Sequence, residues 1–100
     1  MFDFIKKIFA GNSEEIKKLV SNGAIIIDVR SPGEFSGGHA KNAINIPLDT
    51  LANNFKKIQK YKKPLVLCCA SGMRSSKAKG ILTSKGLENV HDAGSWVNLR

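Results

Sequence analysis

The chain has 100 residues, of which 42% are hydrophobic and 24% are charged, which fits one folded domain and argues against a disordered chain. No apolar run approaches the ~20 residues that a membrane-spanning helix needs. Sixteen Lys and Arg residues against eight Asp and Glu give a formal net charge of +8, which attracts small anions and acidic partners. The few aromatic residues are not interleaved with the lysines, so nucleic acid is not an expected partner.

The first twelve residues are predicted to form a separate N-terminal segment, and residues 13–100 the folded domain. Residues 2–9 are apolar but interrupted by Asp3, Lys6 and Lys7, which predicts a short amphipathic helix that covers an edge of the core. Contact of residues 2–9 with a membrane or a partner is the second interpretation. A secretion signal is the least favoured one, because no clear cleavage site follows.

Helical and strand-like segments alternate along the rest of the chain. A cap and two acidic residues open a helix over 13–22, and Gly23 is a natural stop. Apolar residues on both alternations predict buried strands at 24–29 and 64–69. The other expected elements are a loop with one helical turn at 34–39, a strand at 43–46, a helix at 49–61, a helix at 74–85, a strand at 87–91 and a final helical turn at 94–99.

This alternation predicts an α/β fold, with a mainly parallel sheet and helices on both faces. In such open sheets, ligands bind at the carboxyl ends of the strands. Cys69 lies at the carboxyl end of the second buried strand. The fold class therefore places Cys69 where a binding site is expected.

The two cysteines, Cys68 and Cys69, are adjacent and have no other partner, so a structural disulfide is not expected and a reducing, cytoplasmic location fits. Strand alternation turns Cys68 away from Cys69, which predicts a core position for Cys68. His39 and His91 are isolated and no Cys-x-x-Cys spacing occurs. We therefore expect no metal and no other cofactor.

The residues after Cys69 are small, and they lead into a helix that begins near Arg74. A tight loop of this kind can point successive N–H groups into one concavity, to which the helix adds its positive dipole end. A cysteine that faces the concavity would have a lowered pKa and act as a thiolate nucleophile without a partner base. Arg74 would add charge for an anionic substrate. The alternative is that Cys69 is a small buried hydrophobe in a routine turn.

Two blocks of residues resemble the single-domain rhodanese family, whose members are thiosulfate sulfurtransferase-like. The motifs are Cys69-x-x-Gly72-x-Arg74-Ser75, Asp28-Val29-Arg30-Ser31-Pro32-x-Glu34-Phe35-x-x-Gly38-His39 and Ala43-x-Asn45-Ile46-Pro47. They lie in the order and spacing of that family, and the resemblance spans residues 13–99. It departs at residues 40–42 and 94–96, and we expect neither departure to affect the sulfur chemistry.

The resemblance implies a rhodanese-like fold with a five-stranded, mainly parallel sheet. It implies that Cys69 takes a sulfane sulfur from a small anionic donor such as thiosulfate, becomes a persulfide, and passes the sulfur to cyanide or to a thiol, which can belong to a protein. The residues implied to cradle the persulfide and the departing anion are Ala70, Ser71, Gly72, Met73, Arg74 and Ser75.

The upstream block is predicted to be scaffold. Arg30 and Glu34 are expected to form an ion pair that fixes the loop after the strand, and Asp28 to hydrogen-bond the backbone near the site. His39 is expected to be a structural hydrogen-bonding residue, and Trp96 to belong to the core or the rim of the pocket.

Two other functions remain as alternatives. Cysteine-dependent phosphatases also use a loop that runs from Cys to Arg, but theirs is longer than the four residues between Cys69 and Arg74. A persulfide carrier that acts on a protein partner would need the same loop as a thiosulfate sulfurtransferase. The sequence does not separate those two sulfur-transfer roles.

Overall fold

A parallel β-sheet forms the centre of the computed structural model, which describes residues 13–100. Its strands are β1 (Ile25–Asp28), β2 (Ile44–Asn45), β3 (Leu65–Cys69) and β4 (Val90–Ser95). They lie in the order β2-β1-β3-β4, and every neighbouring pair is parallel. The predicted N-terminal segment, residues 1–12, lies outside the described residues.

The two central strands are buried on both faces, as their unbroken apolar runs predict. Ile27, Leu67 and Cys69 belong to the core on one face of the sheet. Val66 and Cys68 belong to the core on the other face. The adjacent thiols Cys68 and Cys69 therefore point to opposite sides of β3, and both are fully buried, which confirms that Cys68 is a core residue.

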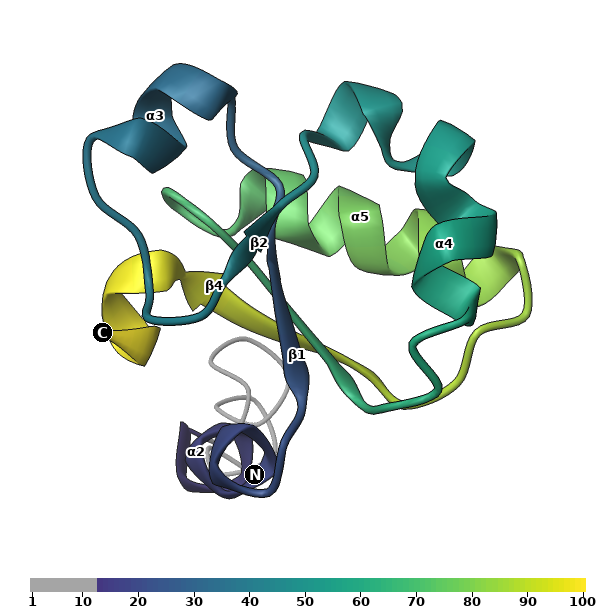
Figure 1. Ribbon diagram of the computed structural model, residues 1–100, viewed down its shortest axis with the longest axis horizontal. Helices are drawn as coiled ribbons and strands as arrows, with labels where there is room; N and C mark the ends of the chain where they lie inside the picture. Colours follow the sequence, from purple (N-terminus) through teal and green to yellow (C-terminus); the bar gives the residue numbers. More distant parts are fainter. Residues whose placement is uncertain (1–12) are drawn as a thin grey trace, which may run out of the picture.

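Helices cover both faces of this sheet, as predicted (Figure 1). Helices α4 (Phe55–Gln59) and α5 (Met73–Ser84) pack against the core of Ile27 and Leu67. Helix α2 (Ser13–Ser21) and the 3₁₀ turn η3 (Trp96–Leu99) pack against the other core. Helix α3 (Pro32–Ser36) follows β1. None of the helices within residues 13–100 is long and apolar enough to cross a membrane.

Three predicted elements differ from the structure. The sheet has four strands in the described part of the chain, not five. The predicted helix at 49–61 is divided into the 3₁₀ turns η1 (Leu48–Thr50) and η2 (Ala52–Asn54) followed by α4. The division occurs where the Asn54 side chain donates to the carbonyl of Thr50 at 2.9 Å, since such local bonds compete with regular helix.

The last strand begins at Val90, not at Leu87. Leu87 belongs to the end of α5, because its N–H donates to the carbonyl of Leu82 at 3.1 Å. Gly86 supplies the left-handed conformation that such a helix end requires, with φ of +99°. Leu87 is apolar because it packs against the core at the end of α5. A strand would also place an apolar residue there, so the sequence pattern does not distinguish a helix end from a strand.

Candidate active site

The loop between β3 and α5 lies at the carboxyl edge of the sheet (Figure 1). Gly72 closes it in the left-handed region, with φ of +105°, and points its N–H at Sγ of Cys69 over 2.9 Å. The Cys69 thiol lies 3.5 Å from Oγ of Ser75 and donates to it. In the thiolate form this contact reverses, and the Ser75 hydroxyl can donate to the sulfur.

The pKa values of the two neighbouring thiols are shifted in opposite directions. Burial favours a higher pKa for Cys69, but hydrogen bonds from Ser75, Gly72 and Ser71 outweigh it, so the pKa of Cys69 lies below its ordinary value. Burial and the nearby carboxylate of Asp28 raise the pKa of Cys68 to about 12. Of these two thiols, Cys69 is therefore the one that ionises more readily.

A thiolate titration should separate the two cysteines. We expect ultraviolet absorbance of the protein to show one thiolate that forms below the ordinary thiol pKa of 9.0. That step should persist in Cys68→Ala and disappear in Cys69→Ser. If Cys68→Ala removed it instead, the assignment of the lowered pKa would be wrong.

Glu34 pairs with Arg74, so the predicted ion pair between Arg30 and Glu34 is wrong. The Glu34 carboxylate accepts two bonds from the Arg74 guanidinium, at 2.7 and 2.9 Å. It also accepts from the N–H of Ser31 at 3.1 Å and the Ser31 hydroxyl at 3.0 Å, as part of the N-terminal cap of α3. This ion pair ties α3 to the first turn of α5, beside the Cys69 loop.

Arg30 instead pairs with Asp28 in the interior. Its guanidinium donates to both carboxylate oxygens of Asp28, at 2.9 and 2.8 Å, and to the carbonyl of Gly38 at 2.7 Å. Asp28 also accepts from the N–H of Arg30 at 3.0 Å, as the predicted backbone contact requires.

The guanidinium carbon of Arg30 lies 4.8 Å from the ring centre of half-buried Trp96, which packs against the core as predicted. His39 contacts the carbonyl of Phe35 at 2.7 Å, in its predicted structural role.

Ionisation of Glu34 should stabilise the fold over a defined pH range. Hydrogen bonds from Arg74 and Ser31 lower its pKa from 4.5 to about 2. A depressed carboxyl pKa stabilises the fold above the unfolded value, and this contribution is lost as pH falls through the folded value. The unfolding free energy of the wild type minus that of Glu34→Gln should therefore stay constant above pH 4.5 and shrink as pH approaches 2. Denaturant titrations at several pH values measure it; a difference independent of pH would contradict the ion pair.

Two hollows flank the candidate site. One, of about 570 Å³, lies between Arg74, the start of α3 and the segment from Pro47 to Thr50. The other, of about 590 Å³, is lined by loop residues together with Lys77 of α5 and Asp92 of β4. Its remaining lining residues are Ser71, Gly72, Met73, Ser76 and Gly94. The Cys69 loop therefore separates two open spaces of similar size.

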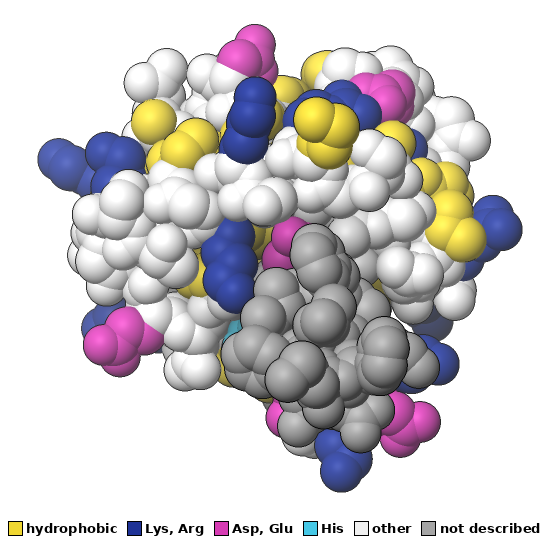
Figure 2. All heavy atoms as spheres, turned by 180° about the vertical axis from the view of Figure 1, so that it is seen from behind, with side chains coloured by type: hydrophobic (Ala, Val, Ile, Leu, Met, Phe, Trp, Pro, Cys, Tyr) yellow, Lys and Arg dark blue, Asp and Glu magenta, His cyan; other side chains and the backbone are white. Residues whose placement is uncertain are grey.

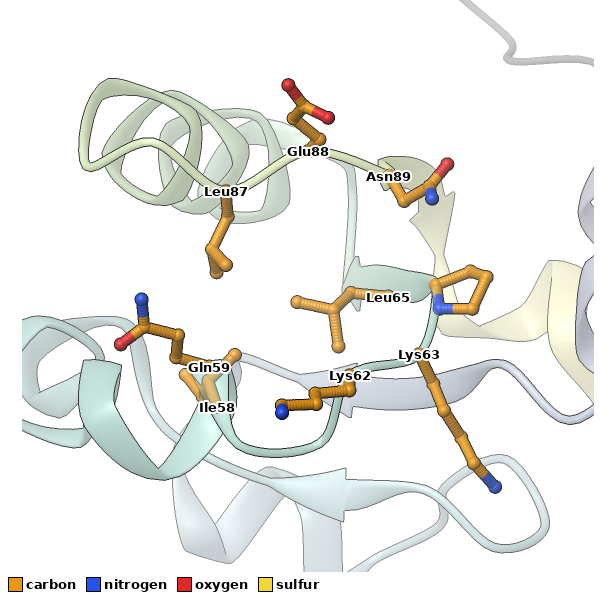
Figure 3. Close-up of a pocket in the computed structure, with 9 residues that line it drawn as sticks. Ile58, Gln59, Lys62, Lys63, Leu65, Leu87, Glu88 and Asn89 are labelled. Carbon is orange, nitrogen blue, oxygen red and sulfur yellow. The ribbon is translucent and has the colours of Figure 1, made fainter.

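A third, smaller hollow of about 210 Å³ lies at the opposite edge of the sheet. Figure 3 shows Leu65 and Leu87 pointing into it, whereas Lys63 points away. It is bordered by the start of β3 and by the turn before β4. Its place at the amino ends of the strands separates it from the Cys69 loop.

Basic side chains are spread over the surface. Figure 2 shows Lys and Arg side chains distributed over one face of the protein, with acidic side chains between them. The residues within 13–100 include no group of three His, Cys, Asp or Glu side chains that could hold a metal ion.

Of the predicted loop residues, Ser71, Gly72 and Ser75 hydrogen-bond Cys69. Met73 is 73% exposed, and Arg74 pairs with Glu34. The structure also adds residues that the sequence did not indicate. Lys77 and Asp92 line the hollow beside the loop, and neither was predicted. Helical spacing could have placed Lys77 one turn beyond Arg74. No sequence signal could have placed Asp92 opposite it, because that depends on how α5 packs on β4.

Residues 12–98 match the family described as Rhodanese-like domain. Thiosulfate sulfurtransferase GlpE of Pseudomonas syringae is 30% identical over 86 residues, which cover 86% of this chain and 80% of that protein. The tRNA uridine(34) hydroxylase of Hamiltonella defensa is 35% identical over 86 residues, which cover 79% of this chain and 24% of that protein. A solved structure described as rhodanese with anions from E. coli has a TM-score of 0.69 at 30% identity, and covers 76% of this chain and 91% of that one.

The chain spans less than two thirds of the length of several curated relatives that it matches. The match to the family nevertheless includes the whole sheet and the Cys69 loop. The chain belongs to the rhodanese-like domain family.

Proposed function

We propose that this domain is a sulfurtransferase that carries a sulfane sulfur as a persulfide on Cys69. The observation that carries the proposal is the 2.9 Å bond from the N–H of Gly72 to Sγ of Cys69. Together with Ser75 it favours the thiolate, which is the nucleophile that sulfur transfer needs. The similarity to a thiosulfate sulfurtransferase supports this class of reaction.

In the first step, the Cys69 thiolate attacks the outer sulfur of thiosulfate. A bond forms between the two sulfur atoms, the sulfur–sulfur bond of the donor breaks, and sulfite leaves with the electron pair. In the second step, an acceptor thiolate or cyanide attacks the outer sulfur of the persulfide. The Cys69 thiolate then leaves and is restored. No electron acceptor and no metal is needed, because the sulfur moves at constant overall oxidation state.

The ion pair of Arg74 argues for sulfur transfer over phosphate chemistry. A Cys-dependent phosphatase needs the loop arginine to face the bound phosphate, whereas Arg74 directs two bonds to Glu34. We propose that Arg74 holds the loop in place through Glu34 and is not a free anion receptor. This differs from the role that the sequence alone suggested for its charge.

A steady-state assay of thiocyanate formation from thiosulfate and cyanide tests the proposal. Two-step transfer through Cys69 requires parallel lines when reciprocal rate is plotted against reciprocal thiosulfate at several cyanide concentrations. Intersecting lines would require both substrates to be bound together, and would contradict a free persulfide intermediate. An aryl phosphate serves as the parallel substrate, and its turnover in place of thiosulfate would overturn the proposal in favour of a phosphatase.

A further inference from the structure

The hollow between α5 and β4 has opposite charges on its two walls. Lys77 contributes an ammonium group from α5, and Asp92 contributes a carboxylate from β4. Neither residue forms an ion pair with another described residue in 13–100. One oxygen of Asp92 accepts from the N–H of Gly94 at 2.9 Å, which fixes the carboxylate to its strand.

The same hollow reaches the residues that hold the sulfur. Its wall includes Gly72, whose N–H contacts Sγ of Cys69. Cys69 itself is fully buried. The outer sulfur of a persulfide extends about 2 Å beyond Sγ, so the outer sulfur is the atom that an acceptor must reach. Because Gly72 both lines the hollow and contacts Sγ, the hollow lies within one residue of the sulfur.

The other hollow beside the loop has a different character. Its wall includes Pro32, Pro47 and Leu48 and one carboxylate, that of Asp49, and its cation, Arg74, is already paired with Glu34. The α5–β4 hollow therefore offers charges of both signs that form no ion pair with another residue in 13–100, beside the loop that holds the sulfur. Its volume of about 590 Å³ lies within the range of small-molecule sites.

We propose that the α5–β4 hollow binds the sulfur acceptor, and that it selects a small thiol carrying both an ammonium and a carboxylate group. Lys77 binds the carboxylate, Asp92 binds the ammonium, and the thiol faces the persulfide. The acceptor thiolate then attacks the outer sulfur, the bond to Sγ breaks, and the Cys69 thiolate is restored. This inference rests on the proposed sulfur transfer and specifies its acceptor. A cysteine inside a protein chain lacks both free charges, so it would not be selected in this way.

Four thiols test the inference against persulfidated protein: cysteine, which carries both charges; 3-mercaptopropionate, which carries only the carboxylate; cysteamine, which carries only the ammonium; and 2-mercaptoethanol, which carries neither. The rate constant for removal of sulfur from Cys69 is compared at equal thiolate concentration. We expect the largest ratios of wild-type to variant rate constants for the thiols whose charge the substituted residue binds, because intrinsic thiolate reactivity also differs among the four thiols. Lys77→Gln should slow the two carboxylate thiols by about three- to fivefold and leave cysteamine unchanged, as loss of one exposed charge pair implies.

Asp92→Asn should slow the two ammonium thiols to a similar extent and leave 3-mercaptopropionate unchanged, since the asparagine amide oxygen can still accept from Gly94. Lys79→Gln is the matched control, because Lys79 is an exposed lysine of α5 that does not line the hollow. Equal slowing of all four thiols, or equal effects of Lys77→Gln and Lys79→Gln, would overturn the acceptor site while leaving Cys69 persulfide formation intact. Failure of the wild type to gain sulfur from any donor would overturn the proposed function and this inference together.

Discussion

Cys69→Ser should lower the rate of sulfur transfer by at least about 1,000-fold, equal to ~4 kcal/mol of lost transition-state stabilisation. A serine hydroxyl is not ionised near neutral pH and cannot form a persulfide, so the first step has no nucleophile. The fold should survive, because serine is close in size to cysteine and the Ser75 hydroxyl lies 3.5 Å from Sγ to bond with it. Thiocyanate formation measures the activity, and denaturant unfolding measures the stability.

Cys68→Ala is the matched control for this variant. Cys68 is equally buried but faces the opposite core, and its raised pKa of about 12 keeps it protonated. We expect Cys68→Ala to keep activity within about threefold of the wild type, which is ~0.7 kcal/mol. If Cys69→Ser were active and Cys68→Ala inactive, the sulfur would be carried by Cys68, which would contradict the proposal.

Arg30→Met should destabilise the domain by about 3–5 kcal/mol, because it leaves the Asp28 carboxylate buried without its partner. Arg30 is 4% exposed and Asp28 is fully buried. The change also removes the bond from the guanidinium to the carbonyl of Gly38. Small domains have a total stability of about 5–15 kcal/mol, so the loss is a large fraction of it. Urea unfolding followed by circular dichroism measures the change.

Two variants make this prediction specific. Asp28→Asn combined with Arg30→Met removes the stranded charge, so it should be more stable than Arg30→Met alone. Arg74→Met breaks an ion pair whose side chains are each 37% exposed, and should cost about 1 kcal/mol or less. If Arg30→Met and Arg74→Met lowered the free energy of unfolding equally, the buried ion pair would not stabilise the fold more than the exposed one, which would contradict the prediction.

The sequence was sufficient to predict the α/β fold class and the tight loop that follows Cys69. Continuous apolar runs identified the two central strands, and their alternation placed Cys68 and Cys69 on opposite faces. The glycine at position 72 and the small residues around it indicated a tight loop, and the structure forms that loop with Gly72 at a positive φ. These features follow from local patterns, which short stretches of sequence contain.

The ion pairs show why the rest could not be predicted. Arg30 and Glu34 are four residues apart, which suggested a local pair. However, α3 begins at Pro32, so Arg30 stands before the helix and turns back to Asp28. Glu34 then meets Arg74, which lies 40 residues further along the chain. Such a contact is set by the packing of α3 against α5, and no local spacing reveals it.

The most direct test of the central claim is the mass of the protein after treatment with thiosulfate. We expect a gain of one sulfur atom, located on Cys69 by peptide mapping, and its removal by cyanide with formation of thiocyanate. The gain should be absent in Cys69→Ser. A sulfur atom found on Cys68, or a protein that gains no sulfur from thiosulfate or from a persulfide donor, would contradict the account.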